Sequence, residues 1–253
     1  MTILRTGSCS PLQYDARMCG RFTFVVDAKE LAAHFDVEAG PFKPRYNIAP
    51  SQDVPIIRLH RASAPGTANV VRQTEEGGRE VAMLRWGLIP HWAKDAKIQY
   101  RTINARAETV ATQPAFREAF RKRRCIVPAS GFYEWSKTDD QGKQPYYIQR
   151  KDEAPLAFAG LWERWIGPDG ATIESFTIIT TAANDLIAPF HDRMPVILAA
   201  GDFDAWLDSA TPADALKALL RPFASDQMKM TRVSKHVNSP RNDDPDCVAG
   251  LDE

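Results

Sequence analysis

The 253-residue sequence contains few of the features that would place a protein in a class at once. Its four cysteines, Cys9, Cys19, Cys125 and Cys247, form no CxxC motif and no other paired spacing. We therefore expect no disulfide framework and no structural zinc site, and the free thiols predict a reducing, cytoplasmic setting. No apolar run reaches the roughly 18 residues that a membrane-spanning helix needs, so we expect no membrane segment.

An excess of charge is missing as well. Lys+Arg and Asp+Glu both number 32, so the net charge gives no indication of nucleic-acid binding, and any such surface must be a local patch. Residues 1–17 lack the apolar stretch of a secretory signal. The sequence shows no linker, repeat or low-complexity tract, and its 44 % apolar and 25 % charged residues are average for a soluble globular protein. We predict one domain.

Short β-rich segments dominate the pattern. Alternating or β-branched stretches predict strands, and capping and helix-face patterns predict a few short helices. Because the strands follow one another without regular helical crossovers, we predict an α+β domain with a mixed, largely antiparallel β-core. The expected strands are 21–26, 54–59, 80–86, 125–127, 132–135, 146–149, 156–165, 175–181 and 194–198; the expected helices are 27–35, 114–124, 202–209 and 212–220.

The dipeptide Met18-Cys19 carries a chemical possibility that no internal cysteine has. If the working chain begins at Cys19, one residue bears both a free α-amine and a thiol. The amine can condense with an aldehyde to an imine, and the sulfur can then close a five-membered thiazolidine ring. Both groups have reactive deprotonated fractions near neutral pH, with ordinary pKa values of about 8 and about 8.5. Two routes to this terminus stay open: initiation at Met18, or removal of a propeptide before Cys19.

Four further stretches place polar residues among apolar ones: residues 85–92, 103–109, 128–135 and 190–195. Each polar residue has an ordinary explanation too. Asn104 can cap or turn the chain, Glu134 can point to solvent from a strand, and His191 can be structural. Alone, none of them identifies a function.

Together, the motifs are recognisable. The ordered set MCGRF, RYNIAP, RWGLIPHWAKD, INARAET, RRCIVPASGFYEW, AGLWE, FTIITTAAN and HDRMPVIL resembles the SOS-response-associated peptidase (SRAP) family of abasic-site processing proteins. The resemblance predicts an extension over residues 1–17, an SRAP domain over residues 18–242 and a polar tail over residues 243–253. It implies a compact mixed β-domain, active as a monomer without cofactor or metal, that captures abasic sites in single-stranded DNA through the N-terminal cysteine and associates with the nucleoid after DNA damage.

The resemblance also implies roles for four residues. Cys19 matches the nucleophile, Asn104 the asparagine of the NAR motif, Glu134 the glutamate of the YEW motif and His191 the histidine of the HxRMP motif. The chemistry suits them. His191 would help to open the closed sugar, Glu134 would transfer protons as water leaves, and Asn104 would orient the amine. Partial burial beside Trp135 would raise the pKa of Glu134.

A DNA surface is expected around these motifs. Arg21, Arg85, Arg106 and Arg193 flank the catalytic positions and would contact phosphates; Trp86 and Trp135 would stack on bases; Pro50 would line the mouth. The ordinary alternatives are arginines paired to carboxylates and tryptophans buried in the core. The basic run Arg121–Arg124 reads instead as the last turn of a helix.

Three functions remain to be weighed. The first is a DNA-damage-response protein that crosslinks itself to abasic sites, with weak lyase activity from the imine stage. The second is a cysteine peptidase, whose natural reaction would be removal of its own residues before Cys19. The third is a non-catalytic single-strand-binding module with Cys19 merely buried. Crosslinking to an abasic oligonucleotide, and its dependence on Cys19, separates them.

Overall fold

The computed structural model describes residues 20–60, 77–136 and 143–251. Residues 1–17 and Cys19 therefore lie outside the described residues. The strands are β1 (Phe22–Phe24), β2 (Arg45–Ile48), β3 (Asp53–Leu59), β4 (Arg79–Trp86), β5 (Asn104–Arg106), β6 (Arg124–Ala129), β7 (Gly131–Trp135), β8 (Pro145–Arg150), β9 (Leu156–Ile166), β10 (Thr172–Ala182), β11 (Arg193–Pro195) and β12 (Met228–Arg232). The α-helices are α1 (Ala28–Phe35), α2 (Arg117–Lys122), α3 (Phe203–Leu207) and α4 (Ala213–Ala218).

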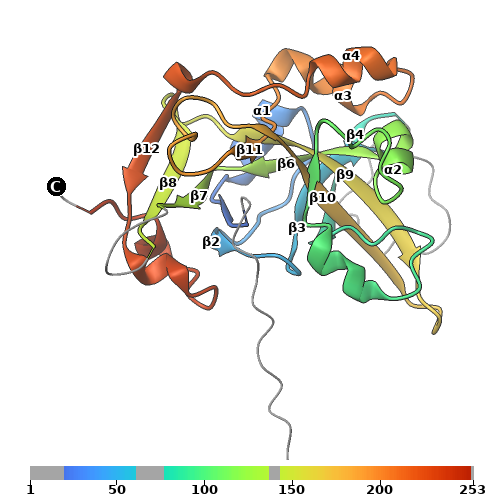
Figure 1. Ribbon diagram of the computed structural model, residues 1–253, viewed down its shortest axis with the longest axis horizontal. Helices are drawn as coiled ribbons and strands as arrows, with labels where there is room; N and C mark the ends of the chain where they lie inside the picture. Colours follow the sequence, from blue (N-terminus) through green and yellow to red (C-terminus); the bar gives the residue numbers. More distant parts are fainter. Residues whose placement is uncertain (1–19, 61–76, 137–142, 252–253) are drawn as a thin grey trace, which may run out of the picture.

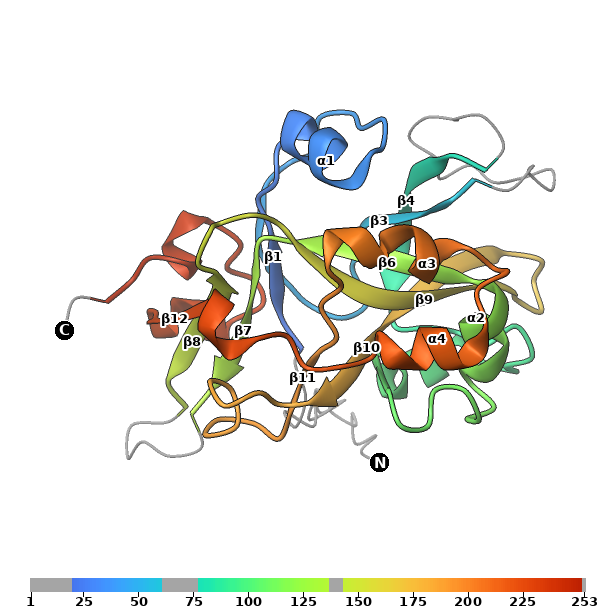
Figure 2. The same cartoon turned by 90° about the horizontal axis from the view of Figure 1, so that it is seen from above.

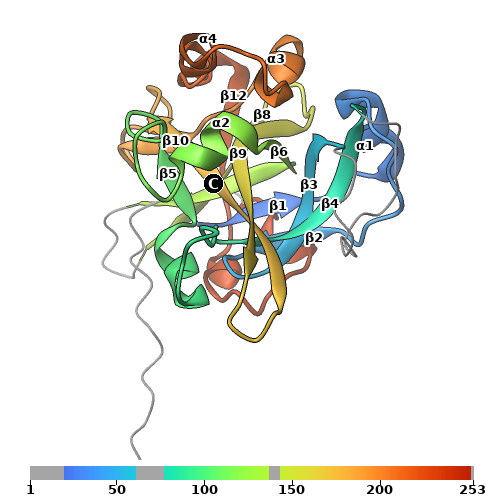
Figure 3. The same ribbon diagram turned by 90° about the vertical axis from the view of Figure 1, so that its right-hand side faces the viewer.

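The larger sheet closes on itself. Its strands follow the order β10-β4-β3-β6-β9, and β9 pairs again with β10, so that these strands form a small barrel (Figure 3). Every pairing in this ring is antiparallel except that of β10 with β4. The short strands β5 and β11 extend the sheet at the end of β10. The predicted α+β fold with a mixed, largely antiparallel core is confirmed.

The second sheet holds β1 as an interior strand, between β7 and the edge strand β2. Its order is β12-β8-β7-β1-β2, and Phe22 of β1 lies between Phe132 of β7 and Ile48 of β2. The two sheets meet through aromatic side chains. The rings of Phe22 and Phe132 pack edge-on against Phe158 of the barrel, with centroids 6.0 and 5.9 Å apart. This packing fixes β1 against both sheets.

The helices are short and lie outside the strands. As predicted, Asp27 caps α1 by accepting a hydrogen bond from the backbone N–H of Glu30 (2.8 Å). Helices α3 and α4 lie together on one side of the barrel (Figure 1), and α1 lies apart from them (Figure 2). Trp206 of α3 donates from its indole Nε1 to the carbonyl of Cys125 (2.9 Å), which ties α3 to β6. None of the helices in the described ranges has the length and apolar character needed to cross a membrane.

Several sequence-based expectations are corrected by the sheet. Residues 45–48 were not among the expected strands, but Arg45–Ile48 form strand β2 because they pair with β1. Strands β5 and β12 were not predicted either. Each is short, and each is stabilised by a partner far away in the sequence, β10 and β8 respectively. Local patterns carry little information about such pairings.

The C-terminal segment is irregular, as expected, but it packs closely on the second sheet. Cys247 has no exposed surface, and Asp243 accepts hydrogen bonds from the backbone N–H groups of Tyr46 (2.5 Å) and Asn47 (2.9 Å). Val233 forms an antiparallel bridge with Gly250. The packed structure thus continues past residue 242, the expected end of the domain.

Candidate active site

Glu134 lies on β7, in the middle of the second sheet. Strand alternation places it on the same face as Phe132, which points into the core. Its carboxyl group is correspondingly buried, with 5 % of the residue exposed, and its Oε1 atom has no hydrogen-bond partner among the described residues. A buried polar atom without a partner is costly, so such atoms concentrate at functional sites.

The surroundings keep the Glu134 carboxyl protonated at neutral pH. The pKa of Glu134 is raised to about 8, mainly by removal from water and also by the nearby negative charge of Asp192, while the backbone N–H of Trp135 and the charge of Lys143 act to lower it. A carboxylic acid with this pKa can both give and take a proton near neutral pH. The expected raised pKa of Glu134 is therefore present, and burial is its main cause.

His191 reaches the same region through its neighbours. Phe190 packs its ring on Tyr146 (centroids 4.7 Å apart), and Tyr146 is the cross-strand partner of Glu134 on β8. The backbone N–H of Arg193 donates to His191 Nδ1 (2.9 Å). The same Nδ1 atom lies 3.2 Å from the carbonyl oxygen of Arg193 and 3.3 Å from Asp192 Oδ1, so the contacts of this turn hold the ring through Nδ1. The turn before β11 thus orients the imidazole.

Asn104 begins β5 and is buried, with 6 % of the residue exposed. It pairs with Ile178 of β10, and the carbonyl of the preceding Ile103 accepts a hydrogen bond from Trp86 Nε1 (2.9 Å). Trp86 in turn packs edge-on against Phe22 of β1 (5.1 Å). Asn104 is therefore held in a short strand that core contacts join to β1.

An ion pair joins the Asn104 and His191 motifs. Arg193 donates from Nη1 and Nη2 to the two carboxylate oxygens of Glu108 (2.6 and 2.9 Å) and from Nη2 to the carbonyl of Thr180 (2.6 Å). The hydrogen bonds from Arg193 lower the pKa of Glu108. The expected phosphate contact by Arg193 is not supported, because its side chain is buried and its fork is occupied by a carboxylate.

Arg21 also turns inward. Its guanidinium donates to Asn47 Oδ1 (2.8 Å) and to the carbonyls of Val237 (2.9 Å) and Asn238 (3.3 Å), and it lies 5.8 Å from the ring centre of Trp135. Fewer of the four arginines named from the sequence are therefore available to contact phosphates. Arg106 is exposed, and Arg85 is half-buried, 3.4 Å from Asp53.

The predicted stacking role of Trp86 is not compatible with its position. Trp86 has no exposed surface and stacks on Phe176 (6.3 Å) inside the barrel, because strand alternation on β4 turns it to the core. The second tryptophan of the same motif, Trp92, is 51 % exposed and was missed. Its signal was the break of the strand at Gly87 and Pro90, which places Trp92 on a loop.

Trp135 and Pro50 are both partly exposed. Trp135 is partly exposed and donates from Nε1 to Asn238 Oδ1 (2.7 Å). Pro50 is half-buried in a turn that joins the backbone of Trp86: Ser51 N–H donates to the Trp86 carbonyl (2.8 Å), and Trp86 N–H donates to the Gln52 carbonyl (2.9 Å). Both positions remain compatible with contact to DNA.

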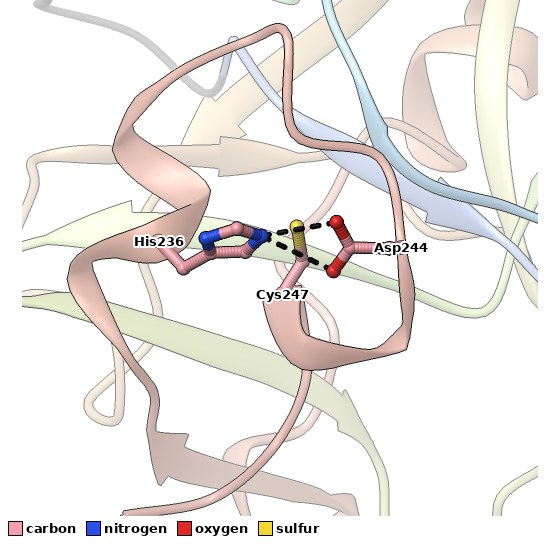
Figure 4. A group of neighbouring side chains, drawn as sticks. All are labelled: His236, Asp244 and Cys247. Atoms are coloured by element: carbon pink, nitrogen blue, oxygen red, sulfur yellow. Dashed lines mark hydrogen bonds and ion pairs between the residues drawn. The ribbon is translucent and has the colours of Figure 1, made fainter.

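Metal-ligating side chains gather at one place in the described part of the chain. The donor atoms of His236, Asp244 and Cys247 lie within 4.8 Å of one another (Figure 4). Thiol, imidazole and carboxylate would suit zinc, but both ring nitrogens of His236 are already engaged in hydrogen bonds. Asn242 Nδ2 donates to His236 Nδ1 (3.1 Å), and His236 Nε2 lies 3.0 Å from Asp244 Oδ2. With Nδ1 accepting, the proton resides on Nε2 and points to Asp244, so this arrangement offers no ring lone pair to a metal.

Strand β7, which carries Glu134, pairs with β1, whereas Asn104 lies on β5 beside β10 and His191 lies in the turn before β11. The backbone N–H of Tyr133 donates to the carbonyl of Arg21 (3.1 Å), so the described chain enters β1 directly beside Glu134. Cys19 precedes Gly20, the first described residue, and lies outside the described ranges. The fold and the candidate site define a class: a β-barrel domain in which the first described strand, β1, runs beside a strand that carries a buried carboxyl with a raised pKa.

The family follows from comparison with known proteins. Residues 18–240 match the model of the family described as SOS response associated peptidase (SRAP). The chain belongs to the SRAP family, as the motifs predicted.

Relatives and solved structures agree. The chain is 41% identical over 237 residues to the abasic site processing protein YoqW of Bacillus subtilis, covering 91% of this chain and 99% of YoqW. It is 32% identical over 241 residues to the abasic site processing protein HMCES of Xenopus tropicalis, covering 85% of this chain and 69% of HMCES. A crystal structure of a Bacteroides thetaiotaomicron protein superposes with a TM-score of 0.78 at 29% identity and covers 92% of this chain and 100% of that chain.

Proposed function

We propose that this protein processes abasic sites in single-stranded DNA by forming a covalent thiazolidine crosslink through Cys19 as the N-terminal residue. The names of its relatives, abasic site processing proteins, support the substrate class. The observation that carries the mechanism is Glu134: a buried carboxyl with an unpaired oxygen and a pKa of about 8, on the strand beside the chain start.

The reaction joins an aldehyde to an aminothiol. The α-amine of Cys19 adds to the aldehyde carbon of the ring-opened abasic sugar and gives a carbinolamine. Loss of the hydroxyl as water gives the imine. The Cys19 sulfur then adds to the imine carbon, its proton ends on the nitrogen, and the ring closes. One water is released overall, and no oxidant or reductant is needed.

Glu134 supplies the proton that the loss of water from the carbinolamine needs. The hydroxyl of a carbinolamine leaves as water only after protonation, and a carboxylic acid with a pKa of about 8 still carries its proton at neutral pH. The resulting carboxylate can take the thiol proton as the ring closes. The same residue then serves the reverse reaction, release of the DNA.

His191 and Asn104 complete the site. His191, which the turn before β11 holds through Nδ1, assists opening of the sugar ring by proton transfer. Asn104, buried at the start of β5, orients the amine by its amide group. We propose that the reaction requires no metal or cofactor and that one chain suffices.

DNA binding would use the exposed groups near the site. Arg106 and Arg85 supply positive charge, and Trp92, Trp135 and Pro50 supply surfaces on which bases can stack or be separated. We propose that the protein associates with DNA in the cytoplasm when abasic sites appear, through this local surface and not through overall charge.

Autoproteolysis is a second activity of the same residues. In the sequence as written, the Cys19 nitrogen is part of an amide, which cannot form an imine. Either translation begins at Met18, or the Cys19 thiol attacks the Met18 carbonyl carbon. In the second case a thioester forms as the C–N bond breaks and the Cys19 amine takes up a proton, and water then hydrolyses the thioester, with Glu134 or His191 assisting the proton transfers. Weak lyase activity is expected as well, since an imine at the sugar permits β-elimination.

The test begins with a chain whose N-terminus is verified by intact mass as Cys19. Incubation with a single-stranded oligonucleotide holding one abasic site should give a heat-stable shifted band on a denaturing gel. Cys19→Ala should give none, and an oligonucleotide with a reduced abasic site, which has no aldehyde, should give none either. Absence of the band with the verified wild-type chain would refute the proposal.

A further inference from the structure

A buried asparagine joins Arg21, the residue before β1, to the C-terminal segment. Asn47 of β2 has no exposed surface. Its Nδ2 atom donates to the carbonyls of Val237 (3.1 Å), Ser239 (3.0 Å) and Asn242 (2.7 Å), and its Oδ1 accepts from Arg21 Nη1 (2.8 Å). One amide therefore contacts a whole turn of the C-terminal segment and the second residue of the described chain.

Arg21 is held by the same segment. Besides Asn47, its guanidinium contacts the carbonyls of Val237 and Asn238 and lies over the ring of Trp135. Trp135 is itself tied to this segment by its hydrogen bond to Asn238 Oδ1 (2.7 Å). Arg21 and Trp135 are close in sequence to two residues of the proposed reaction. Arg21 comes two residues after Cys19, and Trp135 directly follows Glu134.

The C-terminal segment is built to hold this arrangement. Asp243 accepts from the backbone N–H groups of Tyr46 and Asn47 and pairs with Arg45, so its attachment to β2 does not depend on Arg21. The cluster of His236 and Asp244 closes the turn from the other side (Figure 4). The segment that provides the carbonyls for Arg21 is therefore also held by contacts that do not involve Arg21.

We propose that residues 236–244, together with Asn47 and Arg21, form a clamp that fixes the start of β1 beside the strand of Glu134. The reacting residue Cys19 comes two positions before Arg21 in the sequence. Asn47 and Arg21 are positioning residues in this proposal, which rests on the proposed crosslinking function. Two extended residues span at most about 7 Å, so an error in the position of Arg21 passes directly to the nucleophile. A displacement of about 1 Å can slow a reaction about 100-fold.

The alternative for Arg21 is a phosphate contact, and one substitution separates the two. Arg21→Lys keeps the positive charge that a phosphate needs, but an ammonium cannot reproduce the fork that reaches both Asn47 and the Val237 and Asn238 carbonyls. The clamp predicts that Arg21→Lys slows crosslinking and leaves DNA affinity unchanged. A phosphate contact predicts nearly normal behaviour in both.

The experiment measures rate and affinity apart. For Asn47→Ala, starting at Cys19, the single-turnover crosslinking rate at saturating abasic single-stranded DNA should fall about 10- to 100-fold. Affinity, measured with Cys19→Ala added to prevent the crosslink, should change by less than about twofold. The rate should keep the pH midpoint near 8 that belongs to Glu134.

Arg124→Ala is the matched control. Arg124 is also a buried arginine that donates to backbone carbonyls, those of Trp206 and Asp208 (both 2.5 Å), but it does so beside α3. It should lower stability without slowing the crosslink, and all variants are compared at a temperature where circular dichroism shows them folded. If Asn47→Ala does not fold, Arg21→Lys carries the test.

The outcomes are distinct. A wild-type chain that forms no adduct refutes the proposed function. A wild-type chain that reacts while Asn47→Ala and Arg21→Lys react equally fast refutes the clamp alone. A loss of affinity that accounts for the whole loss of rate also refutes it, because the residues would then act on DNA.

Discussion

Two buried glutamates of this protein differ in their partners and therefore in their chemistry. Glu80 on β4 is 3 % exposed and Glu134 on β7 is 5 % exposed. Arg58 Nε donates to one oxygen of Glu80 (2.6 Å), and His60 Nδ1 lies 2.7 Å from the other. The Oε1 atom of Glu134 has no partner in the described ranges. The two side chains are buried to a similar extent but differ in their partners. Glu80 is held by an arginine and a histidine, whereas Glu134 has an oxygen without a partner in the described ranges, and burial raises its pKa.

The largest effect should come from removing the proton donor. Glu134→Gln should slow crosslinking at pH 7 by about 10²- to 10⁴-fold, the usual contribution of a general acid or base. Glu80→Gln should leave the rate within about twofold, since its group does not face the reaction. Single-turnover gel assays at saturating abasic DNA measure both. Equal losses in the two variants would remove the distinction drawn between the two glutamates.

The stability of the two variants should move in opposite directions. The Glu134 pKa is raised from 4.5 to about 8, so the folded state holds a proton that the unfolded state releases. Wild-type stability therefore falls as pH rises from about 4.5 to about 8. Because one pKa unit corresponds to about 1.4 kcal/mol, Glu134→Gln should be more stable than wild type by several kcal/mol at pH 8.5 and nearly equal at pH 4. Urea unfolding of both proteins at both pH values measures these free energies. The same difference between variant and wild type at pH 4 and pH 8.5 would contradict the prediction.

Glu80→Gln should instead lose about 3 kcal/mol of unfolding free energy, because breaking a buried ion pair leaves a charge uncompensated. Arg58 is the charge concerned. It keeps a second contact to Glu174 (3.2 Å) and lies 4.1 Å from the ring centre of Trp162, so the protein should still fold. Chemical denaturation at pH 7 checks the loss. A stabilised Glu80→Gln would show that this pair is not structural.

The two tryptophans of the RWGLIPHW motif allow a smaller test. Trp92→Ala should weaken binding of single-stranded DNA by about 1–3 kcal/mol, the value of one stacked base. Trp86→Phe should leave affinity unchanged, because Trp86 is fully buried. Fluorescence anisotropy in a Cys19→Ala background, where no crosslink forms, measures both. Loss of affinity in Trp86→Phe alone would overturn the assignment.

The smallest effect is expected from a single exposed cation. Arg106→Ala should reduce the slope of log affinity against log salt by about one phosphate contact. Arg193→Ala should not reduce this slope, because Glu108 occupies its guanidinium. A salt series of binding curves provides the measurement. An unchanged slope in Arg106→Ala would exclude Arg106 from the DNA surface.

The sequence predicted the fold class and the motifs well, because strand alternation and local caps are written in neighbouring residues. It predicted Trp86 and Arg193 poorly. Whether a tryptophan in a strand faces the core depends on register, and whether an arginine is occupied depends on a carboxylate such as Glu108, 85 positions away. The clamp around Asn47 could not be predicted for the same reason: the three carbonyls that its amide contacts lie 190 or more positions along the chain.

The pKa of Glu134 lies between these cases. A glutamate between aromatic residues on a strand indicated partial burial, but the missing partner of its Oε1 and the nearby charge of Asp192 depend on tertiary structure. The site residues named from the family resemblance thus gained a physical reason only when the sheet placed β7 beside β1.

Mass spectrometry of the protease-digested adduct tests the central claim most directly. The account predicts that the crosslinked peptide begins at Cys19, and that its mass equals the sum of that peptide and the abasic nucleotide fragment minus one water. An adduct on any other residue, or on a chain that still carries the residues before Cys19, would contradict it.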